Sequence, residues 1–212
     1  MHHKLYIDNL RIKLNEVPLP GKEAQYRMAP EHRKIIPPGQ DVPVKAAVLL
    51  LLYPHQDHIH IILTRRPEYN GHHSGQISFP GGKKENSDTS LEMTALRETY
   101  EELGISPGQI DIMGHLSPLF IPVSNFIVLP IVGYTANKPK ITPDPFEVEK
   151  VIETPVRRFI DGDILRFKEM FLGGKPIKIP YYNVAGDHVW GATAMILSEF
   201  IELHKRHSII PE

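Results

Sequence analysis

Residues 81–105 read GGKKENSDTSLEMTALRETYEELGI. The pattern predicts a helix over residues 89–103, and Gly104 follows it as the left-handed residue that commonly ends a helix. A short strand at residues 76–79 is expected just upstream, and it stops at a Pro-Gly-Gly turn where a backbone can approach a phosphate closely. The stretch therefore predicts a strand, a glycine turn and a helix in succession.

Three glutamates of this helix can share one face. Glu98 and Glu102 are four residues apart, and Glu98 and Glu101 are three apart. The stretch holds three basic and six acidic residues, a local charge of −3, and like charges at such spacing destabilise a bare helix. A hard divalent cation, Mg²⁺ or Mn²⁺, would offset that repulsion because it prefers carboxylate oxygens. We therefore favour a metal site over a solvated acidic face.

Arg97 lies on a neighbouring face of the same helix. It can pair with Glu101 along the helix, or with Asp88 or Glu85 from the preceding loop. Either of the loop pairings would hold the loop onto the helix.

The rest of the chain predicts a mixed sheet with helices packed against it, an α/β or α+β fold. Helices are expected at residues 5–14 and 191–205, the second with a buried stripe that includes His204. Further strands are expected at residues 46–53, 58–65, 110–116, 126–134, 148–153, 168–171 and 177–182. We divide the chain into an N-terminal accessory segment, residues 1–43, and a main domain, residues 44–207.

Composition narrows the class of protein. The 212 residues are 41% hydrophobic and carry a net charge of −1, which suits a globular core and argues against nucleic acid as the main partner. Cysteine is absent, so disulfides and cysteine-based sites are excluded. No apolar stretch is typical of a signal peptide or a membrane span. We expect a cytoplasmic protein without a membrane partner.

The acidic helix resembles the signature of the Nudix hydrolases, G-x5-E-x7-R-E-U-x-E-E-x-G-U with U aliphatic. Asp88 replaces the first Glu, eight residues instead of seven separate it from Arg97, and Thr99 stands at an aliphatic position. A subgroup, the coenzyme A pyrophosphatases, shares the first two departures, so they narrow the resemblance. The matching residues are Gly82, Arg97, Glu98, Glu101, Glu102, Gly104 and Ile105.

A second motif of that subgroup, L-L-T-x-R-S-x-x-L-x-x-H-x-G-E-x-x-F-P-G-G, is similar to residues 62–82, ILTRRPEYNGHHSGQISFPGG. Gln76, Pro67 and Asn70 are departures from it. The matches are Leu63, Thr64, Arg66, His73, Gly75, Phe79, Pro80, Gly81 and Gly82. The resemblance covers residues 44–205.

The resemblance implies a Nudix α/β/α sandwich and an Mg²⁺- or Mn²⁺-dependent pyrophosphohydrolase. The implied reaction cleaves coenzyme A, or a derivative, to 4′-phosphopantetheine and adenosine 3′,5′-bisphosphate. The expected catalytic residues are Glu98, Glu101, Glu102 and Arg97, and the three glutamates are also the expected metal ligands. The expected substrate-binding residues are Arg66, His73, Gly81, Gly82 and Lys83. The general base stays open among Glu101, Glu85 and Glu147.

Other residues allow more than one interpretation. For His72 and His73 a zinc site is less favoured than a substrate contact at His73, because adjacent loop residues seldom close a tetrahedral site. His58 and His60 are expected to be exposed. Trp190 could stack on an adenine or pack in the fold, and the sequence favours neither.

Two other functions compete with the first. One is hydrolysis of another nucleoside diphosphate conjugate, such as ADP-ribose or NADH. The other is a catalytically silent nucleotide sensor, which ranks behind the enzymes because the carboxylates are intact and residues 1–45 do not suit a helix-turn-helix unit. The expected partner is a small nucleotide, and the N-terminal segment either covers a sheet edge or contributes to a homodimer.

Overall fold

The computed structural model describes residues 2–30, 42–68, 75–172 and 175–211. Its helices are α1 (His2–Glu16), α2 (Gly21–Tyr26), α3 (Leu91–Leu103), the short η1 (Pro107–Gln109), α4 (Val156–Asp161) and α5 (Gly191–His207). Its strands are β1 (Val44–His55), β2 (His58–Arg65), β3 (Ile77–Ser78), β4 (Gly81–Lys83), β5 (Asp111–His115), β6 (Leu119–Ile121), β7 (Phe126–Tyr134), β8 (Lys150–Pro155), β9 (Leu165–Leu172), β10 (Lys175–Val184) and β11 (Asp187–Val189).

Strand β1 forms the centre of a mixed sheet. It pairs in parallel with β7 from Val44 to Leu52, and it pairs antiparallel with β2 and with β4. The path across the sheet is β3-β2-β1-β7-β5, with β8 on β2 and β6 on β7. A parallel pair in the middle of a sheet is normally covered on both faces, which explains the uninterrupted apolar run in β1.

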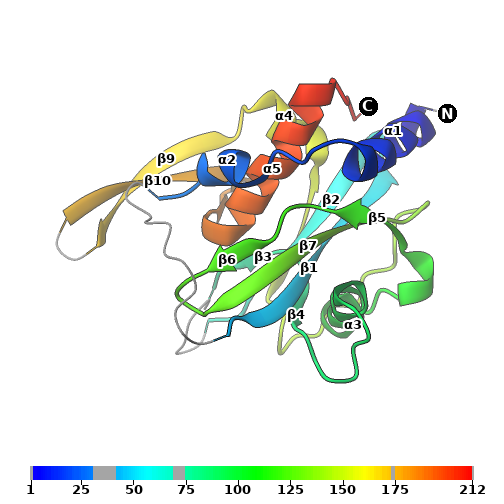
Figure 1. Ribbon diagram of the computed structural model, residues 1–212, viewed down its shortest axis with the longest axis horizontal. Coiled ribbons are helices and arrows are strands. Elements are labelled where there is room, and N and C mark those ends of the chain that lie inside the picture. The colour runs from blue at the N-terminus through cyan, green and yellow to red at the C-terminus, as the bar shows by residue number, and fades with distance from the viewer. Residues whose placement is uncertain (1, 31–41, 69–74, 173–174, 212) are drawn as a thin grey trace.

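The side chains of β1 enter two separate cores. Alternate residues beginning with Ala47 join the core beneath α3, while those beginning with Ala46 join the core that α1 and α5 cover. Figure 1 shows this arrangement, with α3 on one side of the sheet and α1, α2 and α5 on the other. The α/β/α sandwich expected from the sequence is therefore confirmed.

The N-terminal helices pack on the core. Side chains of α1, including Leu10 and Leu14, belong to the same buried cluster as α5. In α2, Ala24 and Gln25 are fully buried. The division between an accessory segment and a main domain at residues 43 and 44 stays a prediction. The first two helices share a core with the rest of the chain, so the two parts are not packed separately.

Strands β9, β10 and β11 form a separate small sheet, and the β9–β10 hairpin extends away from the body in Figure 1. Within the described residues, no helix has both the length and the apolar character needed to cross a bilayer.

The sequence patterns located most long elements correctly. Strands β2 and β7 have the predicted bounds, and Gly104 ends α3 with a φ of 67°. Several short elements were missed: α2, α4, β4, β6 and β11. Because each is six residues or fewer, none has room for a clear periodic pattern.

Candidate active site

Two glycines bring the end of β4 against both β1 and α3. Gly81 pairs opposite Val48, and a Cβ at Gly81 would lie 2.6 Å from the Val48 Cα. Its φ of 153° also disfavours other residues. At Gly82, a Cβ would lie 2.5 Å from the carboxylate atoms of Glu98. The prediction of a turn at Gly81 and Gly82 was wrong: both residues belong to strand β4, where the absence of a side chain at Gly82 lets the Glu98 carboxylate lie directly on the backbone.

Glu102 is the most enclosed carboxylate of α3, with 2% of its surface exposed. Its Oε1 accepts a hydrogen bond from the Gly81 backbone N–H at 3.3 Å and lies 3.5 Å from an Arg66 guanidinium nitrogen. Its Oε2 accepts from the Thr64 hydroxyl at 3.4 Å. Burial raises the pKa of Glu102 to about 7 despite these contacts, and Glu98 and Glu147 raise it further by repulsion.

Glu98 and Glu101 are joined by one guanidinium nitrogen. Arg97 Nη1 donates to Glu98 at 2.9 Å and to Glu101 at 2.8 Å. The Glu98 side chain is 14% exposed, whereas that of Glu101 is 48% exposed. Burial raises the pKa of Glu98, although Arg97 opposes the shift. Glu98 and Glu102 therefore face inward, and Glu101 lies at the rim.

Arg97 also holds the preceding loop onto α3. Its Nε and Nη2 donate to the two carboxylate oxygens of Asp88 at 3.1 and 3.0 Å, and Nη2 donates to the Lys83 carbonyl at 3.0 Å. Asp88 further accepts from Thr94 and from the Glu85 backbone. The hydrogen bonds from Arg97 hold the pKa of Asp88 well below its usual range. The loop pairing predicted for Arg97 is present.

Arg65, the last residue of β2, and Arg66, which follows it, point in opposite directions. Thr64 and Arg66 lie on the face toward Glu102. Arg65 points the other way and pairs with Asp187 of β11 and Glu149. Of these two arginines, only Arg66 reaches the acidic centre. The role of Thr64 as a donor to Glu102 was missed, and its spacing of two from Arg66 was the signal that could have found it.

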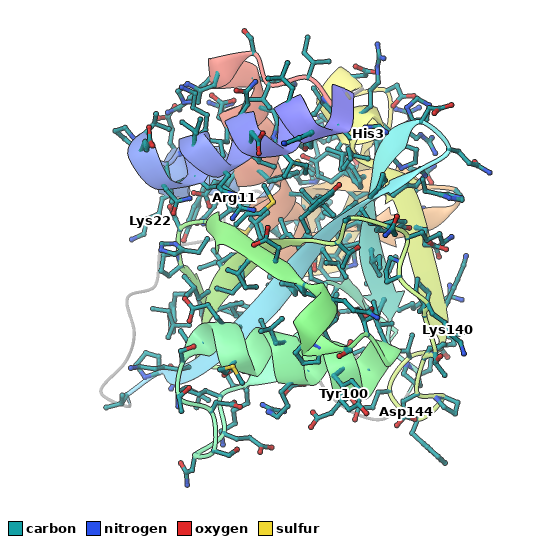
Figure 2. The ribbon with its side chains drawn as sticks, turned by 90° about the vertical axis from the view of Figure 1, so that its right-hand side faces the viewer. His3, Arg11, Lys22, Tyr100, Lys140 and Asp144 are labelled. Carbon is teal, nitrogen blue, oxygen red and sulfur yellow. The ribbon has the colours of Figure 1, made fainter. Side chains whose placement is uncertain are left out.

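A rigid loop adds a fourth acidic side chain. The backbone N–H of Thr142 donates to the Leu103 carbonyl at 2.8 Å, and that of Asp144 donates to the Glu102 carbonyl at 2.9 Å. Figure 2 shows Asp144 close to the end of α3 that carries Tyr100. Repulsion by Glu147 on this loop contributes to the raised pKa of both Glu98 and Glu102.

The acidic side chains of the described residues are not arranged as a complete set of metal ligands. Across the described ranges, no three histidine or acidic side chains are arranged to hold one ion. Glu98 and Glu101 point at Arg97, while Glu102 points at Gly81 and Arg66. Binding an ion at all three would require Glu101 to leave Arg97.

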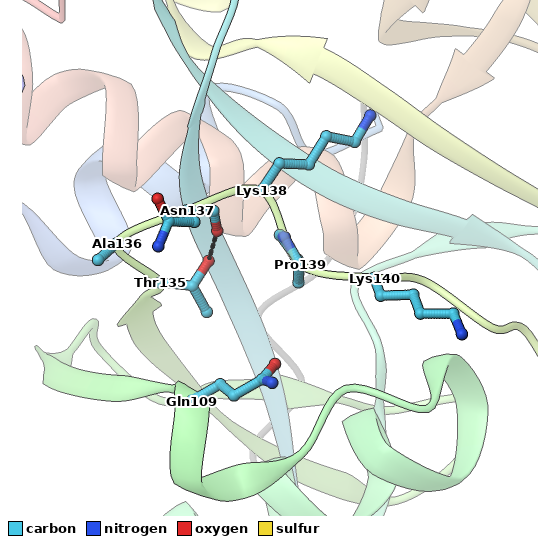
Figure 3. A pocket seen from close by; sticks show the side chains of 7 residues that line it. All are labelled: Gln109, Thr135, Ala136, Asn137, Lys138, Pro139 and Lys140. Carbon is cyan, nitrogen blue, oxygen red and sulfur yellow. Dashed lines mark hydrogen bonds between the residues drawn. The ribbon is translucent and has the colours of Figure 1, made fainter.

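A polar pocket of about 310 Å³ lies beyond β7, and the described residues expected at the active site do not line it (Figure 3). Thr135 closes one wall by donating to the Asn137 carbonyl at 2.8 Å. Lys138 is paired with Glu153 at 2.8 Å. The lining residues are Gln109, Thr135, Ala136, Asn137, Lys138, Pro139 and Lys140.

The sequence profile of the NUDIX domain matches residues 43–160, more than half of the chain. The chain belongs to the Nudix family. Nudix hydrolases generally use divalent metal ions.

Named relatives agree with the Nudix assignment. Mitochondrial Nudix hydrolase 15 of Arabidopsis thaliana is 36% identical over 76% of this chain and 58% of its own length. The mitochondrial coenzyme A diphosphatase NUDT8 of Homo sapiens is 30% identical over 76% of this chain and 70% of its own. This Nudix chain thus spans little more than half of the plant relative. The names place both relatives in mitochondria, and a cytoplasmic location for this chain stays a prediction.

A solved Nudix hydrolase from M. Smegmatis, RenU, supports the fold. It has a TM-score of 0.52 and 14% identity, over 77% of this chain and 87% of that one. At this identity the likeness concerns the fold alone.

The remaining expectations have mixed outcomes. His72 and His73 lie outside the described residues. The expectation that His60 is exposed was wrong: it is buried between the rings of Tyr53 and His55. Trp190 is half-buried with the Lys168 ammonium 5.1 Å from its ring, and both interpretations of it stay open.

Proposed function

We propose that this Nudix protein hydrolyses the diphosphate of coenzyme A or a derivative, with Mg²⁺ or Mn²⁺, to 4′-phosphopantetheine and adenosine 3′,5′-bisphosphate. The observation that carries the chemistry is the buried pair Glu98 and Glu102 against the Gly81–Gly82 backbone. The substrate rests on the second motif, residues 62–82, and on the relative named a coenzyme A diphosphatase.

The donor set fits a divalent cation. Two carboxylates whose pKa values are raised by burial and by repulsion from neighbouring glutamates gain most from a nearby positive charge. Oxygen donors of this kind suit Mg²⁺ and Mn²⁺. Glu98 and Glu102 would be the firmest ligands, with Glu101 joining from the rim. When bound, the metal would activate a water and neutralise charge on the diphosphate.

The substrate side would be supplied by β4 and by Arg66. Gly81 and Gly82 would bring the strand backbone beside the acidic centre, and Arg66 adds a cation beside Glu102. Lys83 is exposed at the end of the same strand. The 3′-phosphate of coenzyme A adds negative charge, so additional cations at this edge would strengthen its binding. His73 remains a proposed substrate contact.

Glu147 is the general base that the surroundings favour. Glu101 is held by Arg97 at 2.8 Å, and Glu85 has a largely exposed side chain 4.0 Å from the same nitrogen. Glu147 stands on a loop fixed to the end of α3 and acts electrostatically on both inward carboxylates. From there it would take the proton of the attacking water.

A substrate panel with product identification tests the proposal. Coenzyme A, acyl-coenzyme A, ADP-ribose, NADH and diadenosine polyphosphates are compared with Mg²⁺ and with Mn²⁺. We expect the highest kcat/KM for coenzyme A or its acyl form, and Glu102→Gln to abolish turnover while the protein stays folded. A preference for ADP-ribose or NADH would overturn the substrate, and near-normal rates of Glu102→Gln at saturating metal would overturn the metal site.

A further inference from the structure

The loop that carries Glu147 is held by its own prolines and hydrogen bonds. It reads TPDPFEV over residues 142–148, and its two prolines restrict the backbone. Asp144 accepts three hydrogen bonds within the loop: its carboxylate from the N–H of Phe146 at 2.8 Å, and its carbonyl from those of Glu147 and Val148. Val148 is buried in the core beneath α3. The backbone around Phe146 is therefore fixed before any ligand arrives.

Phe146 itself is fully presented to solvent. Its exposed fraction of 89% is the largest among the large hydrophobic residues that the structure describes. A phenylalanine ring is most often buried in a folded protein, yet this turn holds the ring outward. Phe146 follows Asp144 by two residues, and the Asp144 backbone N–H donates to the Glu102 carbonyl at 2.9 Å, so the loop that carries the ring is bound to the end of α3 that carries Glu102.

We propose that Phe146 is the stacking surface for the adenine base of the substrate. This inference rests on the proposed function. A diphosphate at the acidic centre is separated from its base by one ribose, so the base must reach a residue beside that centre, outside the ligand set. Phe146 has that position. The four glutamates repel an anionic ligand until a cation is bound, whereas stacking on an uncharged ring does not depend on the charge of the site.

Other aromatic rings are less suited. Tyr100 lies on α3 with its side chain directed away from the sheet (Figure 2), and the Trp190 ring is half-buried, with the Lys168 ammonium 5.1 Å from its centre. A fixed, uncovered ring next to the acidic centre is the feature that only Phe146 combines among the aromatic residues the structure describes.

The test compares kinetics on coenzyme A and on a synthetic analogue without the adenine. Phe146→Ala should raise KM for coenzyme A about 10- to 100-fold, the range expected for one stacked base, with kcat little changed. Phe146→Trp should keep the native KM, and Phe146→Ala should not change KM for the base-free analogue. Phe171→Ala removes another exposed phenylalanine, on β9, and serves as the matched control.

Two outcomes would overturn the inference: an unchanged KM of Phe146→Ala on coenzyme A, or an equal rise on both substrates, which would assign the ring to another part of the ligand. Binding gives a readout independent of turnover. In the double variant Phe146→Trp, Trp190→Phe, the loop carries the only tryptophan. Adenosine 3′,5′-bisphosphate should quench its fluorescence, while ribose 5-phosphate should not. Failure of all turnover with quenching intact would refute the proposed function alone, and absence of quenching would refute the stacking role.

Discussion

Glu102 illustrates how one buried side chain can be poor for stability and good for chemistry. It accepts from the Gly81 N–H and lies next to Arg66, yet burial dominates and raises its pKa from 4.5 to about 7. The folded protein therefore holds this proton to higher pH than the unfolded chain. Above pH 7 the metal-free protein must keep a buried negative charge, which lowers its free energy of unfolding.

Glu102→Gln should remove that penalty. In the presence of a chelator, the stability of the wild type that depends on this group is complete below about pH 4.5 and is lost as pH rises through 7. The variant should be more stable than the wild type at pH 8, by up to about 3 kcal/mol, and similar at pH 4. Urea unfolding at both pH values measures the difference.

The difference between the two proteins is the informative quantity, because another buried group titrates in the opposite sense. Burial lowers the pKa of His204 to about 4, so its contribution is present above pH 6.5 and is lost as pH falls through 4. Both proteins share that trend. An equal stability difference at pH 4 and pH 8 would show that Glu102 titrates normally.

Residue types and spacing predicted the acidic helix and its end at Gly104, because those features are local. They could not show which carboxylate is buried, nor that His60 lies between two rings. Burial and ring contacts depend on which strands lie side by side, as with β1 and β2. Strand alternation does predict that Arg65 points away from the acidic centre once Arg66 is known to face it.

At the scale of elements, the site depends on how closely β4 approaches its neighbours. The two glycines of that strand face different obstacles: backbone of β1 at Gly81 and the end of a flexible side chain at Gly82. A side chain at Gly81 should therefore disturb folding, whereas a side chain at Gly82 should disturb the active site.

Gly81→Ala should destabilise the fold, by roughly 2–4 kcal/mol, because its Cβ would meet the Val48 backbone. Gly82→Ala should leave the melting temperature nearly unchanged, since the Glu98 carboxylate can move away, but should reduce kcat and weaken metal binding. Thermal melts and a Mn²⁺ titration of both variants give the comparison. Normal metal affinity in Gly82→Ala would show that the position of Glu98 over Gly82 is not needed.

Long elements were predictable and short ones were not. The run of β1 and the stripe of α5 each span many residues and so repeat their pattern. Strand β4 consists of two glycines and a lysine, and α2 of six residues, and both are stabilised by packing on distant parts of the chain. The sequences of those two segments alone therefore do not predict them.

For the whole molecule, a buried carboxylate of α5 ties the N-terminal segment to the main sheet. Glu199 is fully buried and accepts from the Gly21 N–H at 3.0 Å, from the Gln25 amide at 2.8 Å and from the Ser117 N–H at 3.2 Å. These donors come from α2 and from the segment between β5 and β6. One side chain thus joins three separate parts of the chain.

Glu199→Ala should therefore destabilise the protein by about 3–5 kcal/mol, because the buried Gln25 amide and the half-buried N–H groups of Gly21 and Ser117 lose their acceptor. Urea unfolding measures the effect, and limited proteolysis should show earlier cleavage in residues 1–30. Glu16→Ala, an exposed change on α1, is the control and should alter stability by less than about 0.5 kcal/mol. A similar small effect of Glu199→Ala would mean that water replaces the carboxylate and that the N-terminal helices are held by apolar packing alone.

The same tie sets an order of events during synthesis. Gly21 and Glu199 are 178 positions apart, so the first two helices leave the ribosome long before the surface they pack on has been made. At typical translation rates of about 5–20 residues per second, that interval lasts roughly 10–40 seconds. Throughout it, the apolar sides of α1 and α2 have no partner helix, and a chaperone that binds nascent chains would find its target there.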